Sequence, residues 1–377
     1  MNYLTDLFSP SRLVPSRNMS LDSVGVERWP DRSLPLIADG QILVSVPSES
    51  RVVGVDERTL AVNGSLYESP DFIYGPGGLK DRTFLVQDEI GGDMERLTIR
   101  VVDLEQGTSR VLTHGEPITM VRGTTVVSGK YIFRDLRGGW VAVDSSSGEI
   151  CWRALSAREC VTYAADANSN CVVSVGADFV VSCLDLTSGA VKWQRRPADL
   201  GLAWGTSYAG RRINVYPHIF QDLVVVAMPG QQIVGLNLSD GSLIWNWKAE
   251  READPYSYHP CVTEDGEILH IANGALYQVS AATGQGRCIG QISGYGSDSG
   301  FEINAVFCDV TTTHVWGVTH TGVIYAVSRE TAAIEWFTDL GAKYALGHPF
   351  VLCNNRIYVQ TTEDQFVIHG GGGYRLD

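Results

Sequence analysis

A short pattern of residues recurs along the whole chain and constrains the fold more than any other feature. Each copy has two alternating apolar residues, an Asp or its substitute, a Gly four residues later and a Trp four residues after that. The clearest copies are Asp144–Gly148–Trp152, Asp185–Gly189–Trp193 and Asn237–Gly241–Trp245. Degraded copies are Ser280–Gly284–Cys288 and Ser328–Ala332–Trp336, with weaker ones at Asp56 and Asp103 and a truncated one ending near His369. Successive copies lie 41 to 52 residues apart. Such a period indicates one small supersecondary unit used many times.

Each repeat has the pattern of four short β-strands. In the repeat that contains Trp152, the four segments are "TMVRGTTV", "KYIFRDL", "WVAVDS" and "EICWRAL". Apolar and polar residues alternate in them, β-branched and aromatic residues are frequent, and Gly, Asp, Asn and Ser separate them. Sustained helical periodicity is almost absent. The sequence therefore predicts an all-β fold.

These repeats resemble those of the pyrroloquinoline-quinone-like (WD40-like) repeat β-propeller family, whose blade consensus is A-x-D-x-x-T-G-x-x-x-W. The resemblance covers about residues 24–370 and is strongest in the middle three copies. In that family the repeat Trp packs against the neighbouring blade and the Gly leaves room for its ring. The resemblance thus implies packing roles for Trp152, Trp193, Trp245 and Trp336. It indicates architecture more than function, because one fold hosts many activities.

Eight pairs of inner and middle strands can be found, which predicts an eight-bladed propeller. Seven blades is the alternative, if the divergent first repeat does not form a full sheet. The last repeat lacks its fourth strand, and "VGVERW" (Val24 to Trp29) has the form of that strand. We therefore expect this segment to complete the last blade and close the ring by pairing near His369, since closure removes exposed sheet edges. The predicted organisation is an N-terminal extension (1–23), a single propeller domain (24–370) and a tail (371–377).

Charge and segment composition narrow the function classes. The net charge is −14 and the sequence pI is about 5.0, which disfavours a nucleic-acid binder, because such a protein needs a basic surface. It permits a basic protein partner. The first residues lack the pattern of a secretory signal, and no apolar run is long enough to span a membrane. These features predict a cytoplasmic protein with no membrane partner; the oligomeric state stays open.

The variable segments of the repeats join the outermost strand of one predicted blade to the innermost strand of the next, so we expect them all on one face. The main ones span 195–218, 248–260, 293–302 and 341–349. They are rich in Tyr, Trp, Arg and His, the residue types that supply large contact area with a polar tip. The predicted partner-binding residues are Trp204, Tyr208, Arg211, Arg212, Tyr216, Tyr256, Tyr258, His259, Tyr295, Tyr344 and His348.

Residue patterns for catalysis, metals and cofactors are weak. There is no G-x-S-x-G motif for a nucleophile and no CxxC pair. The quinone-dependent dehydrogenases of the related superfamily use an adjacent Cys-Cys pair with Asp, Glu and Asn around calcium, and this sequence has no Cys-Cys dipeptide. His259 and His348 each precede a Pro, but no matching carboxylate cluster accompanies them. The sequence thus favours a non-catalytic protein, with no catalytic residue, metal site or cofactor assigned.

The leading hypothesis is a propeller scaffold that binds a protein partner across its loop-rich face, with an inhibitor or immunity-type protein of a basic effector as one specific version. The alternative is an enzyme or small-ligand binder at the central channel, for which His259, His348, Arg211 and Tyr344 are the candidates. A third class is an assembly scaffold similar to the propeller lipoprotein of outer-membrane assembly. That class needs a Cys soon after a signal segment, and the first Cys here is Cys151.

Overall fold

The computed structural model describes most of the repeat region and little of the connecting segments. The described residues are 17–20, 36–38, 40–46, 50–56, 59, 62–71, 73–80, 82–90, 93–120, 126–155, 165–168, 170–176, 179–202, 215, 217–228, 232–249, 260–272, 274–292, 307–318, 323–339, 350–353, 356–360 and 365–369. The chain divides into two compact units. Unit 1 contains residues 1–19, 173–182 and 193–377, and unit 2 contains residues 20–172 and 183–192.

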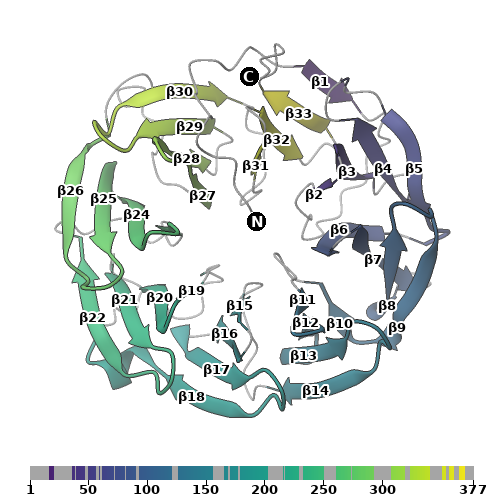
Figure 1. The fold of residues 1–377 in the computed structure, drawn as a ribbon, viewed down its shortest axis with the longest axis horizontal. Helices are drawn as coiled ribbons and strands as arrows, with labels where there is room; N and C mark the ends of the chain where they lie inside the picture. The colour runs from purple at the N-terminus through teal and green to yellow at the C-terminus, as the bar shows by residue number, and fades with distance from the viewer. Residues whose placement is uncertain are drawn as a thin grey trace. The chain divides into compact units, whose positions relative to one another are not determined.

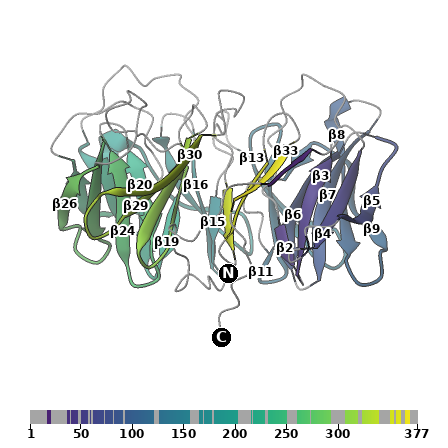
Figure 2. The same ribbon diagram turned by 90° about the horizontal axis from the view of Figure 1, so that it is seen from above.

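Unit 2 contains three antiparallel sheets whose strands follow chain order (Figure 1). The first consists of β2 (Leu36–Ala38), β3 (Gln41–Val46), β4 (Arg51–Asp56) and β5 (Val62–Glu68). The second consists of β6 (Ile73–Lys80), β7 (Thr83–Ile90), β8 (Asp93–Asp103) and β9 (Ser109–Glu116). The third consists of β10 (Ile118–Thr119), β11 (Val126–Val127), β12 (Lys130–Asp135), β13 (Gly139–Asp144) and β14 (Ile150–Leu155), with β10 and β11 both pairing with β12. In the view of Figure 2, β3, β4 and β7 lie together, and Leu43, Val52 and Phe84 from these strands pack in one cluster.

Unit 1 repeats the same four-strand arrangement. One sheet consists of β19 (His218–Phe220), β20 (Leu223–Met228), β21 (Gln232–Asn237) and β22 (Leu243–Lys248). The next consists of β23 (Cys261–Val262), β24 (Glu267–Ala272), β25 (Ala275–Ser280) and β26 (Gly286–Gln291). The third consists of β27 (Phe307–Val310), β28 (His314–Val318), β29 (Val323–Ser328) and β30 (Ile334–Asp339). A further sheet combines β31 (Phe350–Cys353), β32 (Arg356–Gln360), β33 (Gln365–His369) and the N-terminal β1 (Arg17–Ser20). The division between the units runs through the sheet of β15 (Ala165–Ala167), β16 (Cys171–Val175), β17 (Val181–Asp185) and β18 (Val191–Arg195), which a 3₁₀ helix, Pro197–Leu200, follows. The prediction of an all-β fold is confirmed.

The second strand of several repeats is largely apolar because both of its faces are covered. All six residues of β20 are buried, as are all five of β16. The fourth strand is an edge strand, and in β22 most residues are exposed while Trp245 is buried. Continuous apolar runs in the second strand and alternation in the fourth therefore reflect their positions in the sheet.

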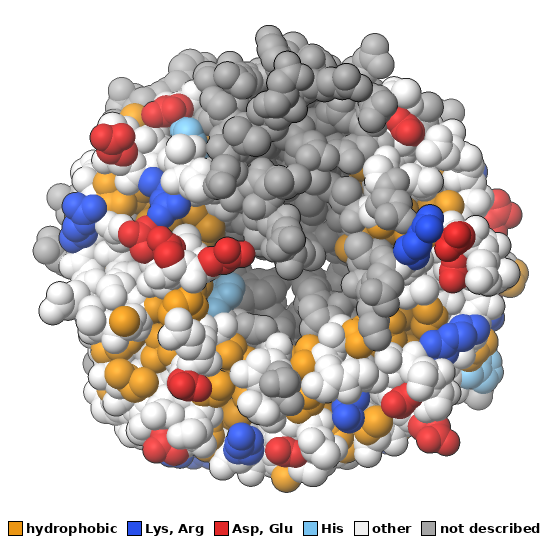
Figure 3. Space-filling view, in the orientation of Figure 1, with side chains coloured by type: hydrophobic (Ala, Val, Ile, Leu, Met, Phe, Trp, Pro, Cys, Tyr) orange, Lys and Arg blue, Asp and Glu red, His pale blue; other side chains and the backbone are white. Residues whose placement is uncertain are grey.

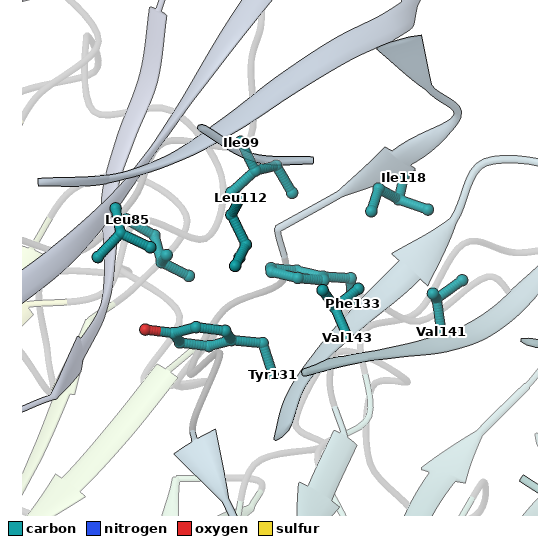
Figure 4. Close-up of a cluster of buried hydrophobic side chains, with 9 residues drawn as sticks. Leu85, Ile99, Leu112, Ile118, Tyr131, Phe133, Val141 and Val143 are labelled. Atoms are coloured by element: carbon teal, nitrogen blue, oxygen red, sulfur yellow. The ribbon is translucent and has the colours of Figure 1, made fainter. Parts of the chain in front are cut away.

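Neighbouring sheets pack face to face through apolar side chains. In unit 2, Figure 4 shows such a cluster between the β6–β9 and β10–β14 sheets, in which Phe133 and Tyr131 meet side chains from the preceding sheet. Its buried members are Leu85, Ile99, Val101, Leu112, Ile118, Tyr131, Phe133, Val141 and Val143. The rings of Tyr131 and Phe133 stack with centroids 5.8 Å apart. These two sheets are thus stabilised by each other as well as by their own hydrogen bonds.

The turn between the third and fourth strands explains the Asp and Gly of the repeat. The Asp144 carboxylate accepts hydrogen bonds from the backbone N–H groups of Ser146 and Ser147 and from the Ser146 hydroxyl. These bonds hold the pKa of Asp144 well below its usual range. Gly148 has φ +76°, a left-handed conformation that favours glycine, and its N–H donates to the Asp144 carbonyl. The repeat residues therefore encode the turn directly.

The repeat tryptophan joins its sheet to the next one, which confirms the packing role for three of the four. The indole N–H groups of Trp152, Trp193 and Trp245 donate to the carbonyls of Leu186, Leu238 and Ala281, each at 2.8 Å. Each acceptor follows the Asp, Asn or Ser of the next repeat. All three tryptophan side chains are at most 8% exposed. A Cβ on Gly189, Gly241 or Gly284 would lie 2.5–2.6 Å from the facing indole, so the repeat glycine also makes room for the ring. Trp336 is half-buried and contacts Trp316.

A register shift near the start of the fourth strand places the tryptophan. Pairing shifts between Ala142 and Val143, and Ala142 then lies opposite Trp152. In the second sheet no shift occurs at this point, and Arg110 lies opposite Val101 instead. The Arg110 guanidinium donates to the Ser145 carbonyl at 2.6 Å, the carbonyl that corresponds to that of Leu186. In the β23–β26 sheet the shift lies further along the strand, between Leu276 and Tyr277, and the exposed Cys288 lies opposite Tyr277, not in the position of a packed Trp.

The N-terminal strand beside β33 is not the predicted one. β1 spans Arg17–Ser20, earlier in the chain than "VGVERW", and Val24–Trp29 lies outside the described residues. Pairing at a sheet edge depends on main-chain groups, and register is weakly specified where no apolar pattern fixes it. The prediction is therefore wrong about the segment that it named, whereas a different N-terminal segment, Arg17–Ser20, does pair with the last strand.

Candidate partner-binding site

The eleven predicted partner-binding residues all lie outside the described residues, so their role stays a prediction. The structure does describe the corresponding end of one sheet in unit 2. There the connection from the outermost β9 to the innermost β10 consists of Pro117 alone, and it meets the turn between β12 and β13. The Leu136 N–H donates to the Pro117 carbonyl at 2.8 Å. This contact ties the turn, residues 135–138, to the connection that leaves the preceding sheet.

Asp135 forms the base of this turn. It is fully buried, and its Oδ1 accepts hydrogen bonds from the backbone N–H and the Nε–H of Arg137 at 2.9 and 3.0 Å. Its Oδ2 accepts from Nη2 of Arg137 at 2.8 Å and from Nη1 of Arg153 at 2.6 Å. Burial alone raises the pKa of a carboxyl, but the bonds from Arg137 and Arg153 outweigh it and hold the pKa of Asp135 below its ordinary value. With four donors on two oxygens, Asp135 acts as an anchor and not as a base or metal ligand.

The two arginines bound to Asp135 have different environments. Arg153 is largely buried, with 21% of its side chain exposed, and it also pairs with Glu116 from the preceding sheet. The Arg137 side chain is 52% exposed, and its pKa is raised by the bonds to Asp135. Leu136, beside it, is one of the few large apolar side chains that are exposed among the described residues, at 38%. The turn therefore presents a guanidinium and an isobutyl group from a fixed backbone.

A related but incomplete cluster lies one repeat earlier. Asp88 occupies in β7 the position that Asp135 occupies in β12, five residues after the start of the strand. Its Oδ2 accepts from the Tyr67 hydroxyl and the Arg100 Nε–H, both at 2.8 Å. Its Oδ1 is buried without a hydrogen-bond donor among the described residues. Both aspartates thus neutralise arginines where one sheet packs on the preceding one, and only Asp135 holds an exposed arginine.

Sequence reasoning missed this site. The usable signal was the Asp in "KYIFRDLRGG", a charged residue at the end of a strand that is apolar and buried along most of its length. Charges of both signs are interspersed over the described part of the surface viewed in Figure 3, so charge alone does not mark the turn. Among the residues that the structure describes, no group of three His, Cys, Asp or Glu side chains is placed to hold a metal ion. No helix in the described part of the chain is long and apolar enough to cross a membrane.

Comparisons with known proteins agree with the repeats and the sheets. The chain belongs to the PQQ_2 family, described as outer membrane protein assembly factor BamB, whose model matches residues 96–336. No curated protein matches the chain.

Solved structures show the same kind of fold. BamB from Moraxella catarrhalis is similar with a TM-score of 0.64 and 15% identity, covering 94% of this chain and all of that one. Sqt1 from Saccharomyces cerevisiae reaches a TM-score of 0.66 at 9% identity, over 95% and 98% of the two chains. The C-terminal WD40 domain of Sif2 reaches 0.62 at 11% identity, over 90% and 95%. At these identities the likeness establishes a propeller-like fold alone.

Proposed function

We propose that this chain is a non-catalytic β-propeller scaffold that binds a protein partner through the face formed by its outer-to-inner connections. The proposal takes the described sheets as eight blades of one domain that begins at β1 (Arg17–Ser20), earlier than the bounds of 24–370 expected from the sequence, with residues 371–377 as a tail. The observation that carries it is the 135–138 turn, where an exposed arginine and an exposed leucine are held rigidly at that end of a sheet. A fixed scaffold that displays such side chains is typical of protein recognition.

A finer version of the proposal concerns the kind of partner. The net charge of −14 favours association with a basic protein, because opposite charges steer encounter. An inhibitor or immunity-type protein that neutralises a basic effector fits this charge. A cytoplasmic location is part of this version of the proposal, and fractionation of native cells tests it. The association rate is measured at increasing salt concentrations. For a basic partner, this rate must fall steeply as the ionic strength rises.

The direct test is affinity purification of the tagged protein from its native cells, followed by mass spectrometry. Wild type is compared with Arg211→Ala/Tyr256→Ala, and Arg82→Ala serves as a control. One stoichiometric protein that is retained by the control and lost from the double variant supports the proposal. If no protein is retained by wild type, the scaffold proposal fails and a small ligand at the central channel becomes the leading hypothesis.

A second candidate is an assembly scaffold at the outer membrane, and the family match favours it. The two candidates differ in where the protein is found and what it binds. Fractionation of native cells separates them: co-sedimentation with outer membranes and retention of membrane proteins support assembly. Recovery in the cytoplasmic fraction with one basic partner supports the inhibitor.

A further inference from the structure

We propose that the Leu136–Arg137 turn binds a carboxylate that is flanked by an apolar side chain, on an exposed segment of a protein partner. The inference rests on the proposed scaffold function and adds the chemistry of one contact. It applies to a partner of either net charge, because a basic protein also carries carboxylates.

One edge of the Arg137 guanidinium is hydrogen-bonded to Asp135, and the other edge is left to bind a ligand. An arginine side chain has five N–H groups, and the hydrogen bonds found among the described residues use one at Nε and one at Nη2, both toward Asp135. The remaining N–H groups of Nη1 and Nη2 match the two oxygens of a carboxylate in a bidentate pair. The side chain is 52% exposed, so this edge is accessible.

The turn is ordered before any partner arrives. The Leu136 N–H is bonded to the Pro117 carbonyl, the Gly138 N–H to the Asp135 carbonyl and the Arg137 N–H to the Asp135 carboxylate. An arginine in solution loses rotamer freedom when it binds, and this arginine has already lost it. The turn therefore binds with a smaller entropic penalty than a free surface arginine.

The local charges favour a carboxylate over a phosphate. Two guanidinium groups, Arg137 and Arg153, are offset by two carboxylates, Asp135 and Glu116. A dianionic phosphate gains most where positive charge is in excess, and here the formal charges cancel. A single carboxylate needs only the directional bidentate contact, and the exposed Leu136 next to it adds an apolar contact.

The test uses three short peptides and the full-length protein. The probe is Ac-Gly-Leu-Glu-Gly-NH₂, compared with the Gln analogue, which lacks the carboxylate, and with the Ala-Glu analogue, which lacks the isobutyl group. Binding is followed by NMR shifts of the backbone amides of Leu136 and Gly138. We expect saturable shifts with the Glu peptide, about tenfold weaker binding of the Gln peptide, and an intermediate affinity for the Ala-Glu peptide. Inorganic phosphate is expected to bind more weakly than the Glu peptide.

Two arginine variants provide the matched comparison. Arg137→Ala must weaken the Glu peptide to the level of the Gln peptide. Arg82→Ala must leave it unchanged, because Arg82 is equally exposed (52%) and pairs with the exposed Glu105 in place of a buried carboxylate. Three outcomes would each overturn the inference. The Glu and Gln peptides could bind equally, or phosphate could bind more tightly than the Glu peptide. Alternatively, Arg82→Ala could weaken binding as much as Arg137→Ala does. If the affinity purification finds a partner that Arg137→Ala still retains with wild-type affinity, this contact is refuted while the scaffold function stands.

Discussion

The indole N–H of Trp193 donates to the carbonyl oxygen of Leu238 at 2.8 Å, and this bond links two consecutive repeats. The same ring lies over Gly241, three residues after Leu238. One side chain therefore supplies both a polar and an apolar contact to the next sheet. Because the same relationship recurs from Trp152 and Trp245, it serves as the joint between successive repeats.

Replacement of Trp193 by Ala tests the strength of this joint. The side chain is 5% exposed, so its loss leaves a cavity and an unbonded carbonyl. We expect the free energy of unfolding to fall by about 3–5 kcal/mol, measured by urea denaturation. Val191→Ala on the same strand is the control, since Val191 is 55% exposed and its truncation changes stability by about 0.5 kcal/mol or less. Equal stability of the two variants would contradict the assignment.

Addition of a methyl group at Gly241 tests the packing from the other side. Gly241 has φ +69° and Gly107 has φ +62°, so Ala at either position costs about 1–2 kcal/mol of backbone strain. A Cβ at Gly241 would also lie 2.5 Å from the Trp193 ring, whereas Gly107 has no atom within 4 Å. We expect Gly241→Ala to be about 1–3 kcal/mol more destabilising than Gly107→Ala. In the Trp193→Ala background this excess must disappear; if it persists, the ring is not its cause.

Asp135→Asn removes a buried charge that two arginines share. We expect a loss of about 3 kcal/mol of stability at pH 7, because Arg137 and Arg153 lose their charged partner. The folded-state pKa of Asp135 lies below its ordinary value, so its stabilisation is full above the unfolded-state pKa, about 3.9, and is lost as the pH falls through the folded-state pKa. Urea denaturation between pH 5 and pH 2 must therefore show a shallower decline for the variant. A wild-type pH profile in Asp135→Asn would refute this, and Glu105→Gln, at an exposed site, is the control.

We expect His270 to make the stability of the protein sensitive to mild acid. It is almost fully buried on β24 beside Trp247, and burial lowers its pKa to about 4. Between pH values of about 6.5 and 4, His270 is protonated in the unfolded chain and neutral in the folded chain. Stability therefore falls with decreasing pH, by about 1.4 kcal/mol per pH unit from this group.

The variant His270→Leu checks the pH effect of this histidine. The stability of the variant must depend less on pH between 6.5 and 4 than that of wild type, whatever its stability at pH 7. Thermal melts of the variant and of wild type across the pH series measure this. His114→Gln is the control, because His114 is exposed. If His270→Leu keeps the wild-type slope, another group is responsible.

The repeat units could be predicted from the sequence because their residues act locally or at a fixed period. The Asp and Gly of each copy shape one turn, and the Trp reaches an acceptor at a constant position in the next copy. The strands predicted around "KYIFRDL" and "WVAVDS" correspond to β12 and β13. Such features repeat often enough to be recognised without any structure.

The Asp135 site could not be predicted in the same way because its members come from separate strands. Two short strands, β10 and β11, separate Glu116 from the strand of Asp135, and Arg153 lies two strands after Asp135, on β14. Nothing in their local sequence indicates that they meet, and charges near strand ends are usually solvated. The eleven aromatic and basic residues of the connecting segments follow no repeat, and their assignment to a partner stays a prediction.

Arg110 shows how such a protein can diverge without losing its architecture. The Ser145 carbonyl accepts from a guanidinium the bond that the equivalent carbonyls accept from indoles. The contact therefore requires a donor that reaches this backbone atom, and both an arginine and a tryptophan supply one. One repeat can lack the Trp of the pattern while its neighbours keep theirs. In this chain the main-chain acceptor keeps its position from repeat to repeat, while the side chain that donates to it differs.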